Sequence, residues 1–261
     1  MIPLKENAIL PVDLGNDGTV ESLYACVYND EDGYGQKIEV RMSRSGDYEN
    51  YTLAEGIFSD YIGYYVRANG QDYLLIRALE GGDLSNIEVF SLSYDGVTKL
   101  SETGYDLLAT GYVATPEDYL IYGYGTFEPG SIPLEVRTDL LGTAFVYSFF
   151  KLDDSGEFQR THEYYYFRAP VYEYDVLTLK QPLECTIYDF ELGKPGESVV
   201  VPVGTELYKI MTDNEDKVIL SEDVTGGRTG YIVEVITDDD YDMTVNGVDP
   251  REIFEGVGYA G

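Results

Sequence analysis

Hydrophobic and polar residues alternate along several short stretches of this chain, with the two-residue period of β-strands. From Leu23 to Tyr28, aliphatic side chains occupy every second position, and Tyr or Cys occupies the positions between them. From Lys37 to Met42, charged side chains alternate with Ile, Val and Met. The pattern predicts strands that turn one face to a core and the other face to solvent.

Turn glycines recur along the first two thirds of the chain and divide it into three units of one plan. Ser45-Gly46, Asp95-Gly96 and Ser155-Gly156 each follow a predicted strand, at spacings of 50 and 60 residues. We attribute the longer interval to an inserted loop over Phe127–Thr143, since insertions fall in loops. The remaining strands of units two and three are expected at Ile62–Arg67, Tyr73–Arg77, Ile87–Leu92, Val97–Leu100, Leu107–Val113, Tyr119–Tyr124, Ala144–Phe150 and Glu157–Thr161.

Four antiparallel strands in roughly 45 to 50 residues is the spacing of a propeller blade. Closed propellers have about four to eight blades, and three units are legible, so we expect an open or irregular propeller-like domain. Ala8–Leu14 and the strands of Tyr164–Leu179 are candidates for a further irregular blade. A β-sandwich or barrel built from the same meanders is the alternative.

The pattern changes near Pro182 to strands punctuated by Gly and Pro, at Cys185–Phe190, Ser198–Val203, Leu207–Thr212, Val218–Ser221 and Tyr231–Ile236, with a turn at Leu192–Gly196. The stretch Val203–Ile210, which contains Gly204-Thr205, and the later Gly230-Tyr231-Ile232 resemble bacterial SH3-like domains. The resemblance covers about residues 183 to 261 and implies a small barrel, often used for cell-wall or peptide attachment. Tyr231 stands where such domains often have Trp.

These patterns together predict an all-β fold with two domains: a propeller-like meander over 1–180 and an SH3-like barrel over 181–261. One short helix is expected near the C-terminus. Asp249 suits the N-cap, Pro250 the first helical position and Glu252 a capping box, while Gly256 can end the turn.

Charge narrows the classes of partner. The chain has 48 acidic and 17 basic residues, a formal net charge of −31. Affinity for nucleic acid or anionic membranes is built from Lys and Arg, so neither partner is expected. The acidity is explained by a solvated surface, by calcium or by a cationic partner. The candidate calcium ligands lie in two acidic loops and are Asp30, Asp32, Asp238, Asp240 and Asp242, with the loop Asp213–Asp216 as a weaker third; neither the spacing nor a closing Glu of an EF-hand is present.

Cys26 and Cys185 are expected to be buried free thiols, since each falls in a predicted strand of a different domain.

The chain contains no apolar stretch of membrane-spanning length, and Met1–Leu14 lacks the features of a signal peptide. Taken literally, Met1 as the native start implies a cytoplasmic protein. The acidic, Tyr-rich, Trp-free composition and the SH3-like end instead resemble mature exported proteins of Gram-positive bacteria, which implies an extracellular or cell-surface location.

Catalytic motifs are not evident in the sequence. His162 is the only histidine, and it is expected at a strand position beside aromatic residues. A zinc site needs several His or Cys ligands, which this composition does not supply. Glycoside hydrolysis needs only two carboxylates, and so an enzyme of that class remains an alternative without a nominated pair.

Tyrosine is the best sequence-level guide to binding, because its ring stacks on sugars or side chains while its hydroxyl stays hydrated. The chain has 26 Tyr, several of them clustered. The predicted ligand contacts are Tyr64, Tyr65, Tyr122, Tyr124, Tyr165 and Tyr231. The sequence thus predicts a non-catalytic extracellular module that binds a cell-envelope glycan or peptide. A carbohydrate-active enzyme and a purely structural domain are the alternatives.

Overall fold

The computed structural model describes residues 2–6, 8–44, 47–58, 60–79, 87–103, 106–107, 131–167, 176–224, 226–238 and 242–259. Most of these residues lie in antiparallel strands, so the predicted all-β class is confirmed. Over the described ranges the helices are η1 (Leu14–Asn16), a single 3-10 turn, and α2 (Pro250–Ile253).

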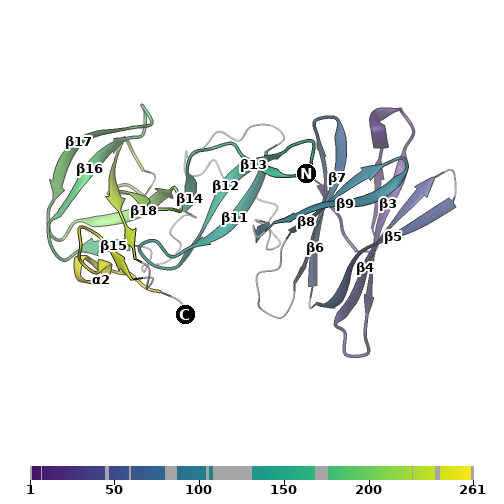
Figure 1. Cartoon of the computed structure of the whole chain (residues 1–261), viewed down its shortest axis with the longest axis horizontal. Coiled ribbons are helices and arrows are strands. Elements are labelled where there is room, and N and C mark those ends of the chain that lie inside the picture. Colours follow the sequence, from purple (N-terminus) through teal and green to yellow (C-terminus); the bar gives the residue numbers. More distant parts are fainter. Residues whose placement is uncertain are drawn as a thin grey trace. The chain divides into compact units, whose positions relative to one another are not determined.

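The first sheet is a meander in the order β2-β3-β4-β5 (Figure 1). Its strands are β2 (Ile9–Val12), β3 (Glu21–Asn29), β4 (Gly35–Arg44) and β5 (Asp47–Phe58). Leu23 and Ala25 of β3 and Ile38 and Val40 of β4 are fully buried, whereas Tyr24 lies on the opposite, outer face. The alternation predicted for both strands is therefore confirmed.

The second sheet has the order β1-β6-β7-β8-β9. Its strands are β1 (Ile2–Pro3), β6 (Asp60–Ala68), β7 (Gln71–Leu79), β8 (Ile87–Ser93) and β9 (Gly96–Thr103). The four strands predicted for the second unit fall within β6 to β9. The predicted turn is also present, because Asp95 lies between β8 and β9 and Gly96 has a φ of 135°.

These two sheets share one hydrophobic core. Val40 and Met42 of β4 pack in the same cluster as Leu74 and Ile76 of β7 and Phe90 of β8. The sheets therefore pack face to face. One face of the β2–β5 sheet packs into this core. The opposite face is the outer face of the sheet.

The third unit differs from its prediction. Its strands are β10 (Asp106–Leu107), β11 (Ile132–Thr138), β12 (Ala144–Leu152) and β13 (Phe158–Arg160). The inserted loop expected over Phe127–Thr143 is wrong where the structure describes it, because β11 pairs there with β12. Pro133 is the second residue of β11. Proline is tolerated near the start of a strand. Tyr119–Tyr124 lies outside the described residues.

The C-terminal strands form a sheet segment in the order β14-β18-β19-β20-β16-β17, with β15 paired to β18 and β23 paired to β15. Their bounds are β14 (Tyr165–Phe167), β15 (Val176–Leu179), β16 (Leu183–Asp189), β17 (Lys194–Val201), β18 (Glu206–Thr212), β19 (Lys217–Ser221), β20 (Thr229–Glu234) and β23 (Phe254–Glu255). A separate two-stranded sheet pairs β21 (Ile236–Thr237) with β22 (Met243–Thr244).

Two predictions for this region need correction. No sheet closes into a barrel within the described ranges, because β17 ends the strand order and its residues are mostly exposed. The predicted turn at Leu192–Gly196 is too long, since β17 begins at Lys194 and Pro195 pairs with Tyr188. Proline is tolerated there because β17 is an edge strand.

The start of the C-terminal helix follows the prediction, whereas the helix ends at Ile253, before β23, and not at Gly256. The capping box of Glu252 stays a prediction. The Asp249 side chain accepts a hydrogen bond from the Arg251 backbone amide, and Pro250 is the first helical residue. Gly256 has a φ of 97°, and a Cβ there would lie 2.3 Å from the Val176 carbonyl oxygen. Only glycine fits this close approach of two backbone segments.

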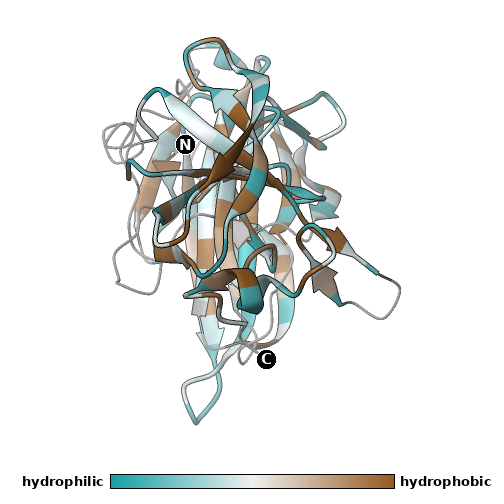
Figure 2. Cartoon of the chain, turned by 90° about the vertical axis from the view of Figure 1, so that its left-hand side faces the viewer, coloured by the Kyte–Doolittle hydropathy of each residue, from teal (hydrophilic) through white to brown (hydrophobic). Residues whose placement is uncertain are grey.

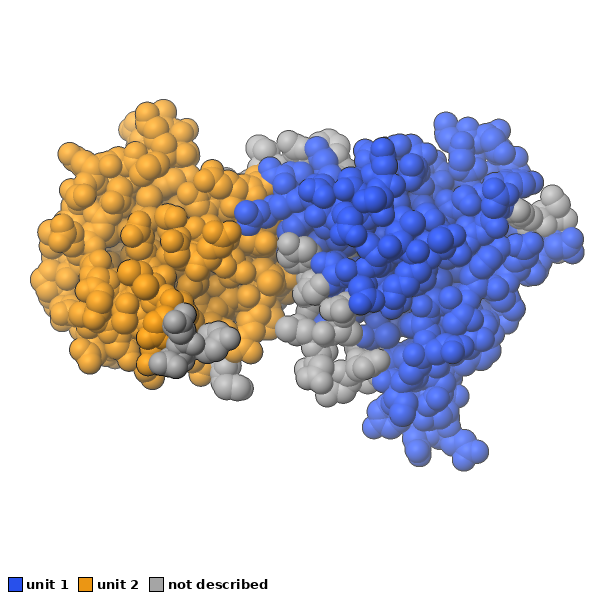
Figure 3. All heavy atoms as spheres, in the orientation of Figure 1, with its two compact units in different colours: residues 1–113, 128–134, 149–161 blue, residues 114–127, 135–148, 162–261 orange. Residues whose placement is uncertain are grey.

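The chain divides into two compact units, coloured in Figure 3. The first takes its described residues from Met1–Val113, Glu128–Leu134 and Phe149–Thr161, and the second takes them from Ala114–Phe127, Glu135–Ser148 and His162–Gly261. The predicted boundary after residue 180 falls within the second unit. Hydrophobic and hydrophilic bands alternate along the strands (Figure 2), and the second unit has its own core, which includes Leu177, Leu207 and Val218.

Candidate functional site

Four of the six tyrosines that the sequence suggested for ligand contact lie in the described residues, and most of these four are interior. Tyr64, Tyr65 and Tyr165 are buried, with 5 to 7% of their surface exposed. The Tyr65 hydroxyl donates a hydrogen bond of 2.6 Å to Asp72, which fixes it in the interior. Tyr122 and Tyr124 lie outside the described residues.

Tyr231 is half-buried on β20, and its hydroxyl donates to the exposed Glu222 at 2.6 Å. Burial and this hydrogen bond raise the pKa of Tyr231 to about 12. The phenol therefore stays protonated at neutral pH, and its proton is shared with Glu222. A ligand that accepts a hydrogen bond from this hydroxyl would have to displace Glu222.

The acidic loops are hairpin turns whose carboxylates bind the backbone. Asp30 accepts hydrogen bonds from the backbone amides of Asp32 and Tyr34, at 3.0 and 2.8 Å, and from Gln36 Nε2. Asp238 likewise accepts from the amide of Asp242 at 2.9 Å. Asp240 lies outside the described residues.

The part of the chain that the structure describes holds no group of three or more His, Cys, Asp or Glu residues arranged for a metal ion. The hairpin bonds explain why aspartate occurs at positions 30 and 238 without invoking calcium. An Asp carboxylate at the start of a turn satisfies backbone amides that the strand ladder leaves without partners.

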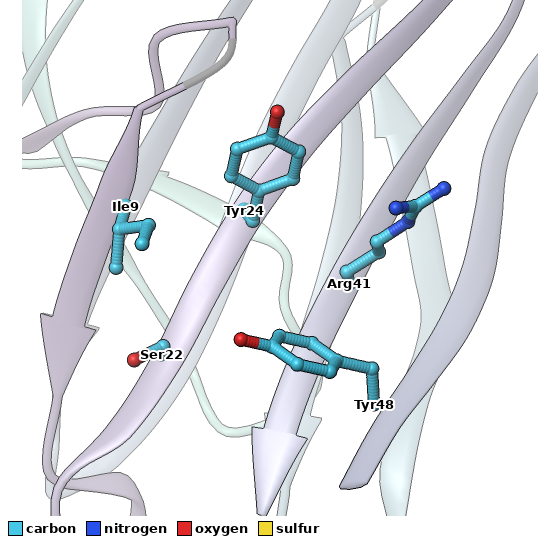
Figure 4. Close-up of a pocket in the computed structure, with 5 residues that line it drawn as sticks. All are labelled: Ile9, Ser22, Tyr24, Arg41 and Tyr48. Atoms are coloured by element: carbon cyan, nitrogen blue, oxygen red, sulfur yellow. The ribbon is translucent and has the colours of Figure 1, made fainter. Parts of the chain in front are cut away.

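A shallow hollow lies on the outer face of the β2–β5 sheet, with a volume of about 210 Å³. Five side chains from all four strands line it: Ile9, Ser22, Tyr24, Arg41 and Tyr48 (Figure 4). Strand register explains their meeting, because Ile9 pairs with Tyr24, Tyr24 with Arg41, and Ser43, the partner of Ser22, with Tyr48.

The rim of the hollow is apolar and exposed. Ile9 and Tyr48 each have 63% of their surface exposed, and the Tyr48 ring lies across the sheet with its hydroxyl directed toward Ser22 (Figure 4). Exposed aliphatic and aromatic groups beside hydroxyls are the chemistry of a site that takes a ring with polar edges.

Arg41 is held in place by a chain of hydrogen bonds along the same outer face. Its Nη2 donates to the Tyr28 hydroxyl at 3.0 Å, and that hydroxyl donates to Glu39 Oε2 at 2.8 Å. Lys37 Nζ lies 2.5 Å from the other Glu39 oxygen. Both Glu39 oxygens are thus occupied, and Arg41 is anchored through a phenol rather than through a carboxylate.

This network affects the protonation of its members. Hydrogen bonds from Lys37 and Tyr28 lower the pKa of Glu39 against the opposing effect of burial. The hydrogen bond to Tyr28 raises the pKa of Arg41 further above its already high ordinary value. Glu39 therefore stays ionised and Arg41 stays charged over the whole physiological pH range.

A second hollow, of about 350 Å³, lies in the C-terminal unit and is lined in part by Asp242, Asp249, Arg251 and Tyr259. Its arginine is already neutralised, because Arg251 Nε and Nη2 both bind the Asp249 carboxylate, at 3.1 and 2.7 Å. The guanidinium is also near the Tyr259 ring, 5.9 Å from its centroid. The site offers a ligand no uncompensated positive charge.

Both cysteines are buried free thiols, as predicted. Burial raises the pKa of Cys185 to about 11 and also raises that of Cys26, so neither is a reactive thiolate. His162 lies beside an aromatic residue as expected, with its ring edge-on to Tyr166. It occupies a bend before β14 and not the predicted strand position.

Sequence reasoning missed the residues of the β2–β5 hollow, although the alternation had already placed Tyr24 and Arg41 on the polar face of their strands. The missing information was the register between strands. That register depends on bulges such as the shift between Tyr28 and Asn29, which hydrophobic periodicity does not reveal.

Comparison of the chain with protein-family models, with curated proteins and with solved structures gives no match in any of the three. The described residues include no helix long and apolar enough to cross a bilayer. The fold and the site define an all-β protein with a tyrosine- and arginine-lined hollow on an open sheet face. Function must be argued from this geometry.

Proposed function

We propose that the chain is a non-catalytic, extracellular or cell-surface binding module that takes a cell-envelope glycan or peptide on the outer face of the β2–β5 sheet. The observation that carries this proposal is the hollow itself. Tyr24, Tyr48 and Ile9 supply ring and aliphatic contacts, and Ser22 and the phenols supply hydrogen bonds.

The organisation of the chain supports the same proposal. Two consecutive four-stranded meanders are compatible with a propeller-like repeat, and the C-terminal strands with an SH3-like attachment domain, although their sheet is open. Binding sites are commonly carried on such rigid scaffolds. The outer face of the β2–β5 sheet is also backed by a fully buried core, so its side chains keep their positions without a ligand.

The test is depletion of the protein from solution by insoluble cell-wall preparations at increasing concentrations of protein. We expect saturable binding that weakens about fivefold or more in Tyr48→Ala and Tyr24→Ala, since loss of one aromatic contact costs about 1–3 kcal/mol. Tyr34→Ala is the matched control, because Tyr34 is 51% exposed and lies outside the hollow.

Two other outcomes identify the alternatives. Turnover of a glycan panel that disappears on exchange of an Asp for Asn indicates a carbohydrate-active enzyme. Absence of saturable binding by the folded protein contradicts the proposal and leaves a structural role within a larger assembly.

A further inference from the structure

We propose that the ligand of the β2–β5 hollow is an acidic glycan, with a carboxylate on its sugar ring, and that Arg41 recognises that carboxylate. The inference rests on the proposed binding function and adds the chemical class of the ligand. It follows from the state of Arg41, from the groups that surround it and from the size of the hollow.

Arg41 differs from most other described arginines in having no direct acidic partner. Arg67, Arg137, Arg228 and Arg251 each form an ion pair with a carboxylate at 2.6 to 3.1 Å. For Arg41, the described residues supply one hydrogen bond, from Nη2 to the Tyr28 phenol. Its Nε is buried, so an external anion would contact the terminal guanidinium nitrogens. In a chain with 48 acidic residues, a guanidinium without a direct carboxylate partner marks a place for an external anion. This guanidinium lies at the edge of the hollow and extends away from Ser22 and Tyr48 (Figure 4).

The Arg41 guanidinium is also preorganised for binding such an anion. A guanidinium has five N–H donors in a fixed plane. The contact with Tyr28 uses one and the Nε–H is buried, so three donors on the terminal nitrogens remain for a ligand. The chain Lys37–Glu39–Tyr28–Arg41 limits the rotation of the side chain before binding. An arginine ordered in advance loses less conformational entropy when it binds a carboxylate, which favours affinity.

The remaining groups favour a sugar over a peptide. The hollow lies on the face of a four-stranded sheet, where the backbone amides and carbonyls of the inner strands β3 and β4 bond to neighbours on both sides and point along the sheet, not out of its face. A peptide backbone would therefore find few amide or carbonyl partners there. The hydroxyls of Ser22 and Tyr48 instead match the hydroxyl groups of a pyranose, whose apolar face can stack on a phenol ring.

The volume limits how much of a ligand can enter. About 210 Å³ lies below the roughly 300 Å³ at which pockets for drug-sized ligands begin. The hollow therefore accommodates one sugar ring, and the neighbouring rings would lie on the exposed surface of β5 near Tyr48 and Asn50.

The net charge of −31 does not prevent this interaction at physiological ionic strength. The field of exposed charges falls off over about 8 Å in 0.15 M salt. A hydrogen-bonded contact between Arg41 and a carboxylate is shorter than that distance and depends on local geometry.

The experiment measures binding of two matched probes to the full chain in 0.15 M NaCl by isothermal titration calorimetry. The probes are an α-1,4-linked galacturonate trisaccharide and its fully methyl-esterified form, which has the same rings without charge. We expect the acid to bind about tenfold or more tightly than the ester, since a hydrogen bond to a charged group contributes about 1.5–3 kcal/mol.

Three variants assign this preference to Arg41. Arg41→Gln should remove the preference for the acid, and Arg41→Lys should keep part of it, because an ammonium lacks the planar fork. Arg228→Gln is the control, since it removes the same charge at a residue with a 75% exposed side chain outside the hollow. Circular dichroism and the unfolding temperature establish that each variant is folded.

Tyr28→Phe gives a second readout that does not depend on removing the charge. Arg41 then loses its anchor, so the ratio of acid to ester affinity should fall while affinity for the ester stays the same. A variant that is merely destabilised would weaken both probes equally.

Failure of the inference and failure of the proposed function are distinguishable. Equal, Tyr48-dependent binding of acid and ester overturns the acidic-glycan inference and leaves a neutral-glycan module. Binding of neither probe, together with binding to a peptide fraction of the cell envelope, also overturns the inference. If no cell-envelope component binds at all, the proposed function itself is contradicted.

Discussion

Asp72 shows how single buried polar groups hold the first unit together. Its carboxylate is 3% exposed and accepts hydrogen bonds from the Tyr65 hydroxyl, from Arg67 Nε and from the Gly15 amide, at 2.6, 2.6 and 3.1 Å. The last of these connects the η1 turn to β7. Burial alone would raise the pKa of Asp72, but these three hydrogen bonds outweigh it and lower the pKa below its ordinary value.

We expect Asp72→Asn to destabilise the protein by about 2 kcal/mol at neutral pH, because an amide cannot replace a carboxylate that binds a guanidinium. Urea unfolding followed by tyrosine fluorescence measures the loss. Asp95→Asn is the control, since Asp95 is exposed in the β8–β9 turn. Equal midpoints for the two variants would contradict the role assigned to Asp72.

The pH dependence of stability follows from the sign of the same shift. A carboxyl whose pKa is lower in the folded state contributes stability that is complete above its unfolded pKa of about 3.9. That contribution is lost as the pH falls through the folded pKa. Between pH 5 and pH 2, unfolding midpoints should therefore fall more steeply for the wild type than for Asp72→Asn; parallel curves would contradict the lowered pKa.

Two hairpin loops of the first unit have the same hydrogen bonds, although only one was singled out in the sequence. Asp153 accepts from the amides of Ser155 and Glu157 and from Gln159 Nε2, which repeats the pattern of Asp30 at the same residue offsets. Gly33 and Gly156 occupy equivalent positions with φ of 88° and 84°. The two loops therefore provide an internal comparison.

The two glycines differ in their surroundings. A Cβ at Gly33 would meet nothing within 4 Å, whereas a Cβ at Gly156 would lie 2.6 Å from Leu100 Cδ1 on β9. We expect Gly33→Ala to cost about 1–2 kcal/mol from the left-handed backbone alone. Gly156→Ala should cost measurably more in urea unfolding. Equal costs would show that the β12–β13 loop does not pack on Leu100.

The hairpin bonds also lead to a prediction for calcium. The oxygens of Asp30 and Asp238 already accept backbone amides, so a bound ion would have to compete with the turn. After chelation, millimolar calcium should raise the unfolding temperature no more than sodium chloride of equal ionic strength does. A further rise of several degrees would restore the acidic loops as metal sites.

The strands that were predicted correctly are those in which packing against the core determines the alternation of hydrophobic and polar residues. β3, β4, β7 and β8 each bury aliphatic side chains in the core, so their periodicity is strong. β11 was missed because Pro133 and charged residues obscure a short strand, even though Ile132 and Leu134 are buried. The burial of individual tyrosines could not be predicted, because tyrosine suits both core and surface. Tyr65 is buried and Tyr48 is exposed, and the hydrophobic pattern does not distinguish them.

The molecule as a whole carries a charge of −31 distributed over two compact units. Repulsion among like charges destabilises a compact chain, and salt screens it. Raising NaCl from about 0.02 to 0.5 M should therefore stabilise the protein by about 1 kcal/mol, which corresponds to about 2–4 °C in unfolding temperature. A decrease in the unfolding temperature would mean that specific ion pairs, and not net repulsion, dominate its electrostatics.

The most direct test of the binding site is a map of backbone amide chemical shifts while the isotope-labelled protein is titrated with the glycan that binds most tightly. The account predicts saturating shifts that concentrate on the outer face of β2–β5, at Tyr24, Arg41 and Tyr48, and that are lost in Tyr48→Ala but retained in Tyr34→Ala. Saturating shifts confined to the C-terminal strands, around Tyr231 or Arg251, would contradict the placement of the site on the β2–β5 sheet.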